Sequence, residues 1–434
     1  MLTSNMDTSM GRRSSAFVCV LFIAMGLLMT IDSTDVQAMP PLASTAKLSL
    51  SKLVDQSNFS AERAARYFVV HLKSAHRVLS TSDEQGGQST ALRYLVNHQS
   101  MEANRDELRM DYILSRSDQV YHREVAQRLS VDPQAMALMG TAANMNHVAH
   151  STAHFRDLRI DAFVTAGVTG NAMRSGDEAR WYQGDEGNEF VGSKGTINTI
   201  LLINRPMTAG AQAKAAMVMV EAKTAALMEL AIASKQSTHL ATGTGTDQFI
   251  VASPLLENSE TDKQVKVLSS ASGHLKLGEL IGTAVREATL EALRWQNALE
   301  PSATRSAVHA LSRFGLSDER VISDSRQYLS EASHQRFSDN LSSVLLEPRV
   351  TASAYALAAV LDRFQYEGLP VSIINESVRD QAANVAVSIC ADTSRWHDFW
   401  QKFETSPVSE HQLMSASMQL FIHALTLGWQ CKWQ

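Results

Sequence analysis

Between about residues 61 and 300, the chain contains two kinds of hydrophobic pattern, one typical of strands and one typical of helices. Short apolar runs bounded by glycine or polar residues predict strands at residues 67–70, 92–96, 160–165 and 195–204. Longer segments predict helices at residues 119–130, 133–155, 209–234 and 277–299. Because these elements mix without a strict alternation, we expect an α+β layered domain over residues 61–300, with an α/β fold as the alternative.

Beyond residue 300 the pattern becomes helical. Helices are predicted at residues 302–314, 317–332, 350–366, 371–391 and 409–428. Proline at positions 348, 370 and 407 separates several of these segments. We therefore expect a mainly α-helical C-terminal region over residues 301–434, and its sequence contains no chemical motif.

The first 38 residues have the layout of a secretory signal. Arg12 and Arg13 precede an apolar run at residues 16–31, and small residues follow at Val36 and Ala38. The run is shorter than the roughly 20 apolar residues that span a membrane. We expect an exported or periplasmic protein. One alternative is that the segment is a membrane anchor. The other is that the true start lies near Met39, which would make the protein cytoplasmic. Residues 39–60, rich in Ser, Pro and Ala, are the expected linker.

Composition excludes some classes of protein. The 434 residues carry a formal net charge of −6 and include no lysine-rich tail, so we expect no nucleic-acid partner. Only three cysteines are present, Cys19, Cys390 and Cys431, and none forms a CxxC motif. Cys390 and Cys431 could pair in an exported protein or stay as free thiols, and the sequence leaves both alternatives open.

The most unusual segment alternates threonine and glycine from Thr242 to Asp247. If it is extended, the three threonine hydroxyls share one face, and the glycines leave the other face open to close backbone approach. If it is a loop, its N–H groups can converge on an oxyanion. A flexible turn is the structural alternative. The candidate substrate-binding residues of this segment are Thr242, Gly243, Gly245 and Thr246.

Two other polar segments follow predicted strands or lie within them. The candidate substrate-binding residues there are Thr165, Gly167, Asn171, Asp177, Thr196 and Asn198. Neither segment matches GxGxxG, so we predict no dinucleotide. Thr196 and Asn198 share one face if their segment is a strand, and a strand-end hydrogen-bonded pair is the structural alternative.

The long helix predicted at residues 209–234 is apolar nearly all round, which is typical of a buried helix. Glu221 would then be a buried carboxylate that needs a partner, and such groups often act in catalysis. Lys223 lies about 200° away from Glu221 on a helix, so the two do not face each other. For Lys223 we expect a solvated end or a structural ion pair.

Histidines offer two further hypotheses. His147, His150 and His154 would share one face of the helix predicted at residues 133–155. Without HExxH or a set of carboxylates at ligand spacing, we interpret that face as an ordinary polar one and predict no metal. His239 and His274 could act as a general base or contact the substrate, with a surface position as the alternative.

Taken in order, these segments resemble the adenosylcobinamide amidohydrolase (CbiZ) family over about residues 65–295. The matching segments are RVLST at 77–81, TAA at 141–143, VTAGV at 164–168, GTIN at 195–198, EAKTAA at 221–226, ATGTGTD at 241–247 and KLGELIG at 276–282. The resemblance also includes Gly86–Gly87, Asn171–Ala172 and Gly176–Asp177. Each motif is modest alone, and their common order makes the resemblance specific.

The resemblance implies cleavage of adenosylcobinamide to adenosylcobyric acid and aminopropanol, a step of corrinoid salvage. Cobalt is then part of the substrate, and no cofactor is implied. The family is typically cytoplasmic, so the signal-like segment and the helical tail are departures from its pattern. A corrinoid uptake system and a second copy of the chain are the other partners that we consider.

For the mechanism, we expect the 242–247 segment to stabilise the oxyanion. Glu221, Asp247 or His239 would activate water or a threonine hydroxyl, with Thr244 as the candidate nucleophile. Self-cleavage before Thr196 or Thr244 is a rival hypothesis. Two readings without hydrolysis also stay open: a non-catalytic corrinoid-binding protein that assists uptake, and a scaffold whose function lies in the helical tail.

Overall fold

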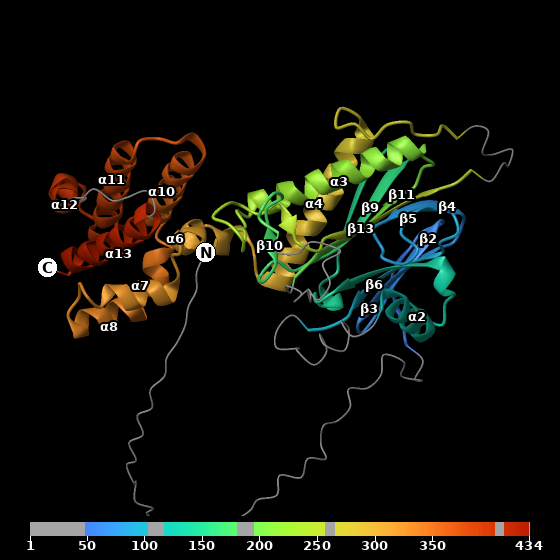
Figure 1. Ribbon diagram of the computed structural model, residues 1–434, viewed down its shortest axis with the longest axis horizontal. Coiled ribbons are helices and arrows are strands. Elements are labelled where there is room, and N and C mark those ends of the chain that lie inside the picture. The colour runs from blue at the N-terminus through green and yellow to red at the C-terminus, as the bar shows by residue number, and fades with distance from the viewer. Residues whose placement is uncertain (1–47, 103–116, 180–194, 257–264, 404–411, 434) are drawn as a thin grey trace, which may run out of the picture. The chain divides into compact units, whose positions relative to one another are not determined.

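The computed structural model describes residues 48–102, 117–179, 195–256, 265–403 and 412–433 (Figure 1). The signal-like segment and Cys19 lie outside the described residues. Among the residues that are described, no helix is both long and apolar enough to cross a membrane.

The first of two large sheets has five strands. In spatial order they are β1 (Ser51–Asp55), β2 (Phe59–Ala64), β3 (Tyr67–Leu72), β6 (Tyr94–Gln99) and β7 (Met136–Thr141). Neighbours are antiparallel except β6 and β7, which are parallel and joined through helix α2 (Asp118–Leu129). β1 and the start of β2 fall within residues 39–60, so the sheet takes in part of the expected linker.

The second sheet has six strands. In spatial order they are β5 (Gly87–Ser89), β4 (His76–Ser80), β13 (Gln248–Pro254), β11 (Ile197–Ile203), β9 (Leu158–Ala166) and β8 (Ala149–Phe155). Only β11 and β13 are parallel, and helix α3 (Ala209–Glu229) lies in the connection between them. Helix α4 (Lys276–Asn297) follows and packs on α3, β8 and β9.

Side-chain alternation along the strands stacks these elements into four layers. In β11, Ile197, Leu201 and Ile203 pack in the cluster that includes α3 and α4, whereas Ile200 and Leu202 pack against the first sheet. The opposite face of the first sheet packs on α2. The layers therefore run from α3 and α4 through the second sheet and the first sheet to α2, which confirms the predicted α+β layered domain.

One predicted helix is wrong. Residues 133–155 form a 3₁₀ turn (Pro133–Ala135), β7, a second turn (Met145–His147) and β8. β7 is covered on both faces, because Ala137 and Met139 pack between the sheets while Met136 and Leu138 pack on α2. A strand buried on both faces lacks the alternation of polar and apolar residues that distinguishes it from a helix.

The C-terminal region is helical, as predicted, and has its own apolar core. Its helices are α5 (Pro301–Thr304), α6 (Ala307–Leu311), α7 (Asp318–Ser325), α8 (Glu331–Asp339), α9 (Leu341–Leu345), α10 (Pro348–Glu367), α11 (Val371–Cys390), α12 (Trp396–Lys402) and α13 (Leu413–Lys432). Short 3₁₀ turns at Ser312–Phe314 and Thr393–Arg395 connect some of them.

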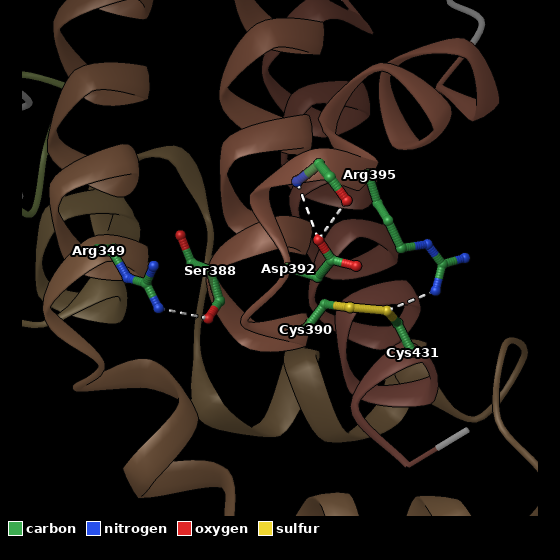
Figure 2. Close-up of a disulfide and its surroundings, with 7 residues drawn as sticks. Arg349, Ser388, Cys390, Asp392, Arg395 and Cys431 are labelled. Atoms are coloured by element: carbon green, nitrogen blue, oxygen red, sulfur yellow. Dashed lines mark hydrogen bonds between the residues drawn. A yellow bond between two sulfur atoms is a disulfide. The ribbon is translucent and has the colours of Figure 1, made fainter.

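A disulfide joins two of these helices. Cys390 ends α11 and pairs with Cys431 near the end of α13, with their Cα atoms 5.2 Å apart (Figure 2). Arg395 donates to the sulfur of Cys431 over 2.9 Å. Of the two alternatives that the sequence left open for these cysteines, the structure shows the bridge.

Candidate active site

A cavity of about 620 Å³ opens where β11 and β13 begin. Its floor includes Ile197 and Thr199 of β11 and Asp247 just before β13. Helix α3 forms one wall. A second wall comes from a small hairpin, in which β10 (Ala172–Met173) pairs with β12 (Gly243–Thr244). Segments distant in the sequence therefore meet around one concave space, as in small-molecule sites.

Lys223 and Asp247 form an ion pair in this cavity. The Lys223 ammonium donates to Oδ2 of Asp247, and their side chains are 11% and 19% exposed. The carboxylate also accepts the N–H groups of Thr244 (3.1 Å) and Ile197 (3.0 Å) and the hydroxyl of Thr244. Four donors thus fill the acceptor sites of one carboxylate. Because Lys223 and the Thr244 hydroxyl both donate to Asp247, the carboxylate holds them near each other.

Gly243 lies directly against the ion pair. A Cβ atom at this position would be 2.7 Å from Nζ of Lys223 and closer still to Oδ2 of Asp247. No residue with a side chain fits there without displacing the pair. The sequence predicted that this glycine permits a close approach, and the structure identifies the approaching groups.

The 242–247 segment is a short strand followed by a turn, so its hydroxyls do not form a row. The Thr242 hydroxyl accepts from the N–H of Ser175 (2.8 Å), and the Thr246 hydroxyl donates to the carbonyl of Gly195 (3.0 Å). Only the Thr244 hydroxyl contacts Asp247.

Most N–H groups of this segment already have acceptors within the protein. The N–H of Thr242 donates to Met173, and that of Gly245 donates to the carbonyl of Asn171. Those of Thr244 and Thr246 donate to Asp247 and to the Thr244 hydroxyl. The ammonium of Lys223 is therefore the better-placed group to stabilise negative charge in the cavity.

Three of the predicted binding residues brace the hairpin and its turn. Asn171 is 6% exposed, and its amide donates to the carbonyl of Gly195 (2.8 Å) and to the Thr246 hydroxyl (3.0 Å). The Thr196 hydroxyl donates to the carbonyl of Thr246 (2.6 Å). Gly167 lies close to Gly195, whose φ is +131°. A Cβ atom at Gly195 would be 2.7 Å from the carbonyl oxygen of Gly167.

Asp177 holds the loop that leads away from β10. Its carboxylate accepts the N–H of Arg174 (2.8 Å) and the hydroxyl of Ser234 (2.6 Å). Burial alone would raise the pKa of Asp177, but hydrogen bonds from Ser234 and Ser237 outweigh it and lower the pKa below its ordinary value. Because Arg174 lines the cavity, Asp177 acts on the site through this loop.

Thr165 and Asn198 lie in a buried polar network between the two sheets. Their exposed fractions are 0% and 1%. Asn198 donates to Asn97 (2.9 Å) and to the carbonyl of Gly140 (3.0 Å), and Asn97 donates to the Thr165 hydroxyl (2.8 Å). These groups satisfy one another and join the sheets beneath the cavity, instead of facing it.

The predicted burial of Glu221 is wrong. Helix α3 has an open face, on which Glu221 is exposed, and Lys223 is the charged residue on the inner side. The sequence did contain a signal for this. Ala215, Met219, Ala222 and Ala226 recur at helical spacing and define the inner face, to which Lys223 is adjacent.

The two candidate histidines do not line the cavity. His239 stacks on Tyr366 with ring centroids 4.8 Å apart, and it is hydrogen-bonded to Tyr366 and Gln365. His274 is exposed in the turn before α4. Thr81, Thr199 and Phe249 do line the cavity, although none was a predicted site residue; only Thr81 belongs to a segment that carries the family resemblance.

The three histidines predicted to share one face of a helix lie on a 3₁₀ turn and a strand. His147 is in a 3₁₀ turn and contacts Gln296 (2.9 Å), whereas His150 and His154 are on β8. His150 contacts Asp161 over 2.9 Å. Across the described ranges, no three metal-ligating side chains are grouped to hold an ion.

A layered α+β domain whose cavity contains a carboxylate bonded to both a lysine and a hydroxyl has the features of a small-molecule site. The chain belongs to the adenosylcobinamide amidohydrolase (CbiZ) family, whose model matches residues 50–301. The cavity residues described above fall within this range.

The chain is also similar to individual proteins. It is 35% identical, over 190 residues, to an uncharacterized protein of Methanocaldococcus jannaschii, covering 42% of this chain and 71% of that protein. A crystal structure of a Pyrococcus horikoshii protein matches with a TM-score of 0.26 and 11% identity, covering 57% of this chain and 83% of that one.

Proposed function

We propose that the protein hydrolyses the amide that joins the aminopropanol arm to the corrin ring of adenosylcobinamide. The products are adenosylcobyric acid and aminopropanol. The proposal is carried by the convergence of Lys223, Asp247 and Thr244 on one cavity, in a chain of this family. Amide hydrolysis needs an attacking group with a base, a stabiliser of the oxyanion and a proton donor for the amine, and these residues provide them.

In the first half of the reaction, the oxygen of Thr244 bonds to the amide carbon, and its proton passes to Asp247, to which it already donates. Negative charge develops on the carbonyl oxygen beside the Lys223 ammonium. The C–N bond then breaks, and the leaving nitrogen takes the proton from Asp247. Water hydrolyses the resulting threonine ester by the same steps, which restores Thr244 and releases the acid.

Direct attack by water on the amide is the rival route, with Asp247 as its base. Thr244→Val and Thr244→Ser separate the two routes, because only serine keeps a hydroxyl. The purified protein is incubated with adenosylcobinamide in the dark, and products are followed by mass spectrometry. We expect turnover by Thr244→Ser and none by Thr244→Val. Turnover by Thr244→Val at the wild-type rate would assign the attack to water.

A corrinoid-binding protein without catalysis is the second candidate function. The Lys223–Asp247 ion pair fits this candidate as well, because two paired charges can hold a structure together without taking part in catalysis. Saturable binding of adenosylcobinamide by the wild type, with no product after prolonged incubation, would replace the hydrolase with this candidate.

We also infer that the protein is exported. The Cys390–Cys431 disulfide supports this inference, because such bridges persist in oxidising compartments and are rare in the cytosol. The signal-like layout of the first 38 residues points the same way. An exported enzyme would trim corrinoids before or during their uptake. Fractionation of producing cells tests this, and recovery of the protein in the cytoplasm with reduced cysteines would refute it.

A further inference from the structure

The open face of α3 carries three large apolar side chains. Met217, Val220 and Met228 are 54%, 42% and 53% exposed. At about 100° per residue they fall within roughly 80° of one another, so they form one stripe along the helix. Among the described helices and strands, no other carries more than one such residue. Three large apolar side chains gathered on one exposed helix face are unusual for a protein surface and are typical of a binding surface, although the charged Glu221 lies on the same face.

The stripe is continuous with the cavity. Val220 belongs to both, because it lines the cavity while its side chain is exposed on the open face. Thr224, one turn further along the helix, also lines the cavity and lies between Val220 and Met228. The stripe, about 16 Å long from Met217 to Met228, therefore extends past the cavity in both directions along α3.

The lining of the cavity has a polar part and an apolar part. Lys223 and Asp247 make one part polar, whereas Met173, Met219 and Phe249 supply apolar surface. Its volume of about 620 Å³ is typical of pockets that enclose drug-sized ligands. A corrin macrocycle with its amide arms and adenosyl group is larger than such ligands. An arm with its amide can enter, while the macrocycle stays outside against whatever surface borders the cavity.

We propose that the stripe formed by Met217, Val220 and Met228 is the docking surface for the hydrocarbon part of the corrin macrocycle. The inference rests on the proposed function. With the ring seated on α3, the aminopropanol arm extends into the cavity and places its amide beside Lys223 and Asp247. The stripe then determines specificity for large, apolar-faced amides, and it contributes to binding without taking part in bond cleavage.

The test measures KM and kcat for adenosylcobinamide in Met217→Ser, Val220→Ser and the double variant. Loss of a partly buried apolar contact weakens binding by about threefold to tenfold per residue. We expect KM to rise by that factor in each single variant and by roughly the product in the double variant. Because the contact is equal in the ground and transition states, kcat should change less than twofold. The dissociation constant of the product adenosylcobyric acid should rise in parallel.

Ile373→Ser is the matched control, because Ile373 is 51% exposed on α11 and belongs to neither the stripe nor the cavity. An unchanged KM in the double variant, with an active wild type, would overturn the docking surface and leave the proposed function intact. A wild type that neither hydrolyses nor binds adenosylcobinamide would instead refute the proposed function. A dimer that dissociates on Met217→Ser, without a change in KM, would assign the stripe to a second copy of the chain and overturn the inference.

Discussion

The ammonium of Lys223 donates to the carboxylate of Asp247, although the two residues lie 24 positions apart and on different elements. Both side chains are largely buried in the wall of the cavity. Such a pair is weak evidence for stability, because desolvation of the two charges offsets their attraction. Its contact with the Thr244 hydroxyl is consistent with the proposed reaction in the cavity.

Replacing Lys223 by methionine should remove the stabiliser of the oxyanion and keep most of the side-chain volume. We expect kcat to fall by roughly 10²-fold to 10³-fold, the range for loss of one such group. Glu221→Gln is the control on the same helix, because Glu221 is exposed and outside the cavity. A Glu221→Gln variant as impaired as Lys223→Met would return Glu221 to the mechanism. Circular dichroism of both variants checks that they fold.

Gly243→Ala should displace the ion pair, because the added methyl group would overlap Lys223 and Asp247. We expect a loss of at least tenfold in kcat, with a smaller effect on Tm because the Lys223 side chain is flexible. Gly282→Ala is the comparison, since a Cβ there meets nothing within 4 Å and favours the helix. Wild-type kinetics in Gly243→Ala would show that the pair need not occupy its observed position.

Several elements of the layered domain could be predicted from the sequence. Short apolar runs predicted β3, β9 and β11, and the helical period predicted α2, α3 and α4, because each of these elements has its boundary or its period in its own sequence. β7 was assigned to a helix, because Met136, Ala137, Leu138 and Met139 are helix-forming residues, whereas the equally buried β11 is rich in isoleucine.

The site was less predictable than the fold. The Thr/Gly segment does line the cavity, and Gly243 stands where Lys223 and Asp247 come close to the backbone. The partners of Asp247 come from Lys223 on α3 and from Ile197 on β11, and only the tertiary structure brings these segments together. Glu221 was preferred over Lys223 because Met217, Val220 and Met228 on the outer face of α3 made the helix look apolar nearly all round.

Asp161 should make the stability of the protein depend on acid pH. Burial alone would raise its pKa, but hydrogen bonds from Arg159, His150 and Thr152 lower the pKa from 3.8 to about 2. A pKa that is depressed in the folded state stabilises the protein above pH 4, and this contribution is lost as the pH falls toward 2.

Asp161→Asn should therefore lower the free energy of unfolding at pH 7 by about 2 kcal/mol and flatten its decline between pH 4 and pH 2. Denaturant titrations across this range measure both effects. Asp157→Asn is the control, because its side chain is 72% exposed and its ion pair with Arg205 should contribute little. Equal acid sensitivity of wild type and Asp161→Asn would assign the decline to other carboxylates.

The disulfide should stabilise the helical region. Cys390 and Cys431 are 41 residues apart, and a bridge closing a loop of this size typically contributes about 2–4 kcal/mol. Cys431→Ser should lower Tm, and wild type under reducing conditions should reproduce the loss. Because the bridge joins α11 to α13 and the cavity lies in the layered domain, kcat below Tm should not change. A fall in kcat on reduction would connect the helical region to catalysis.

The proposed reaction is cleavage of the aminopropanol amide of adenosylcobinamide in this cavity. The most direct test incubates the purified full chain with adenosylcobinamide in the dark and quantifies both products by mass spectrometry. We predict adenosylcobyric acid and aminopropanol in equal amounts from the wild type, and neither above background from Asp247→Ala. Products formed equally by Asp247→Ala would exclude Asp247 from the reaction, and a wild type that forms none would exclude the hydrolase.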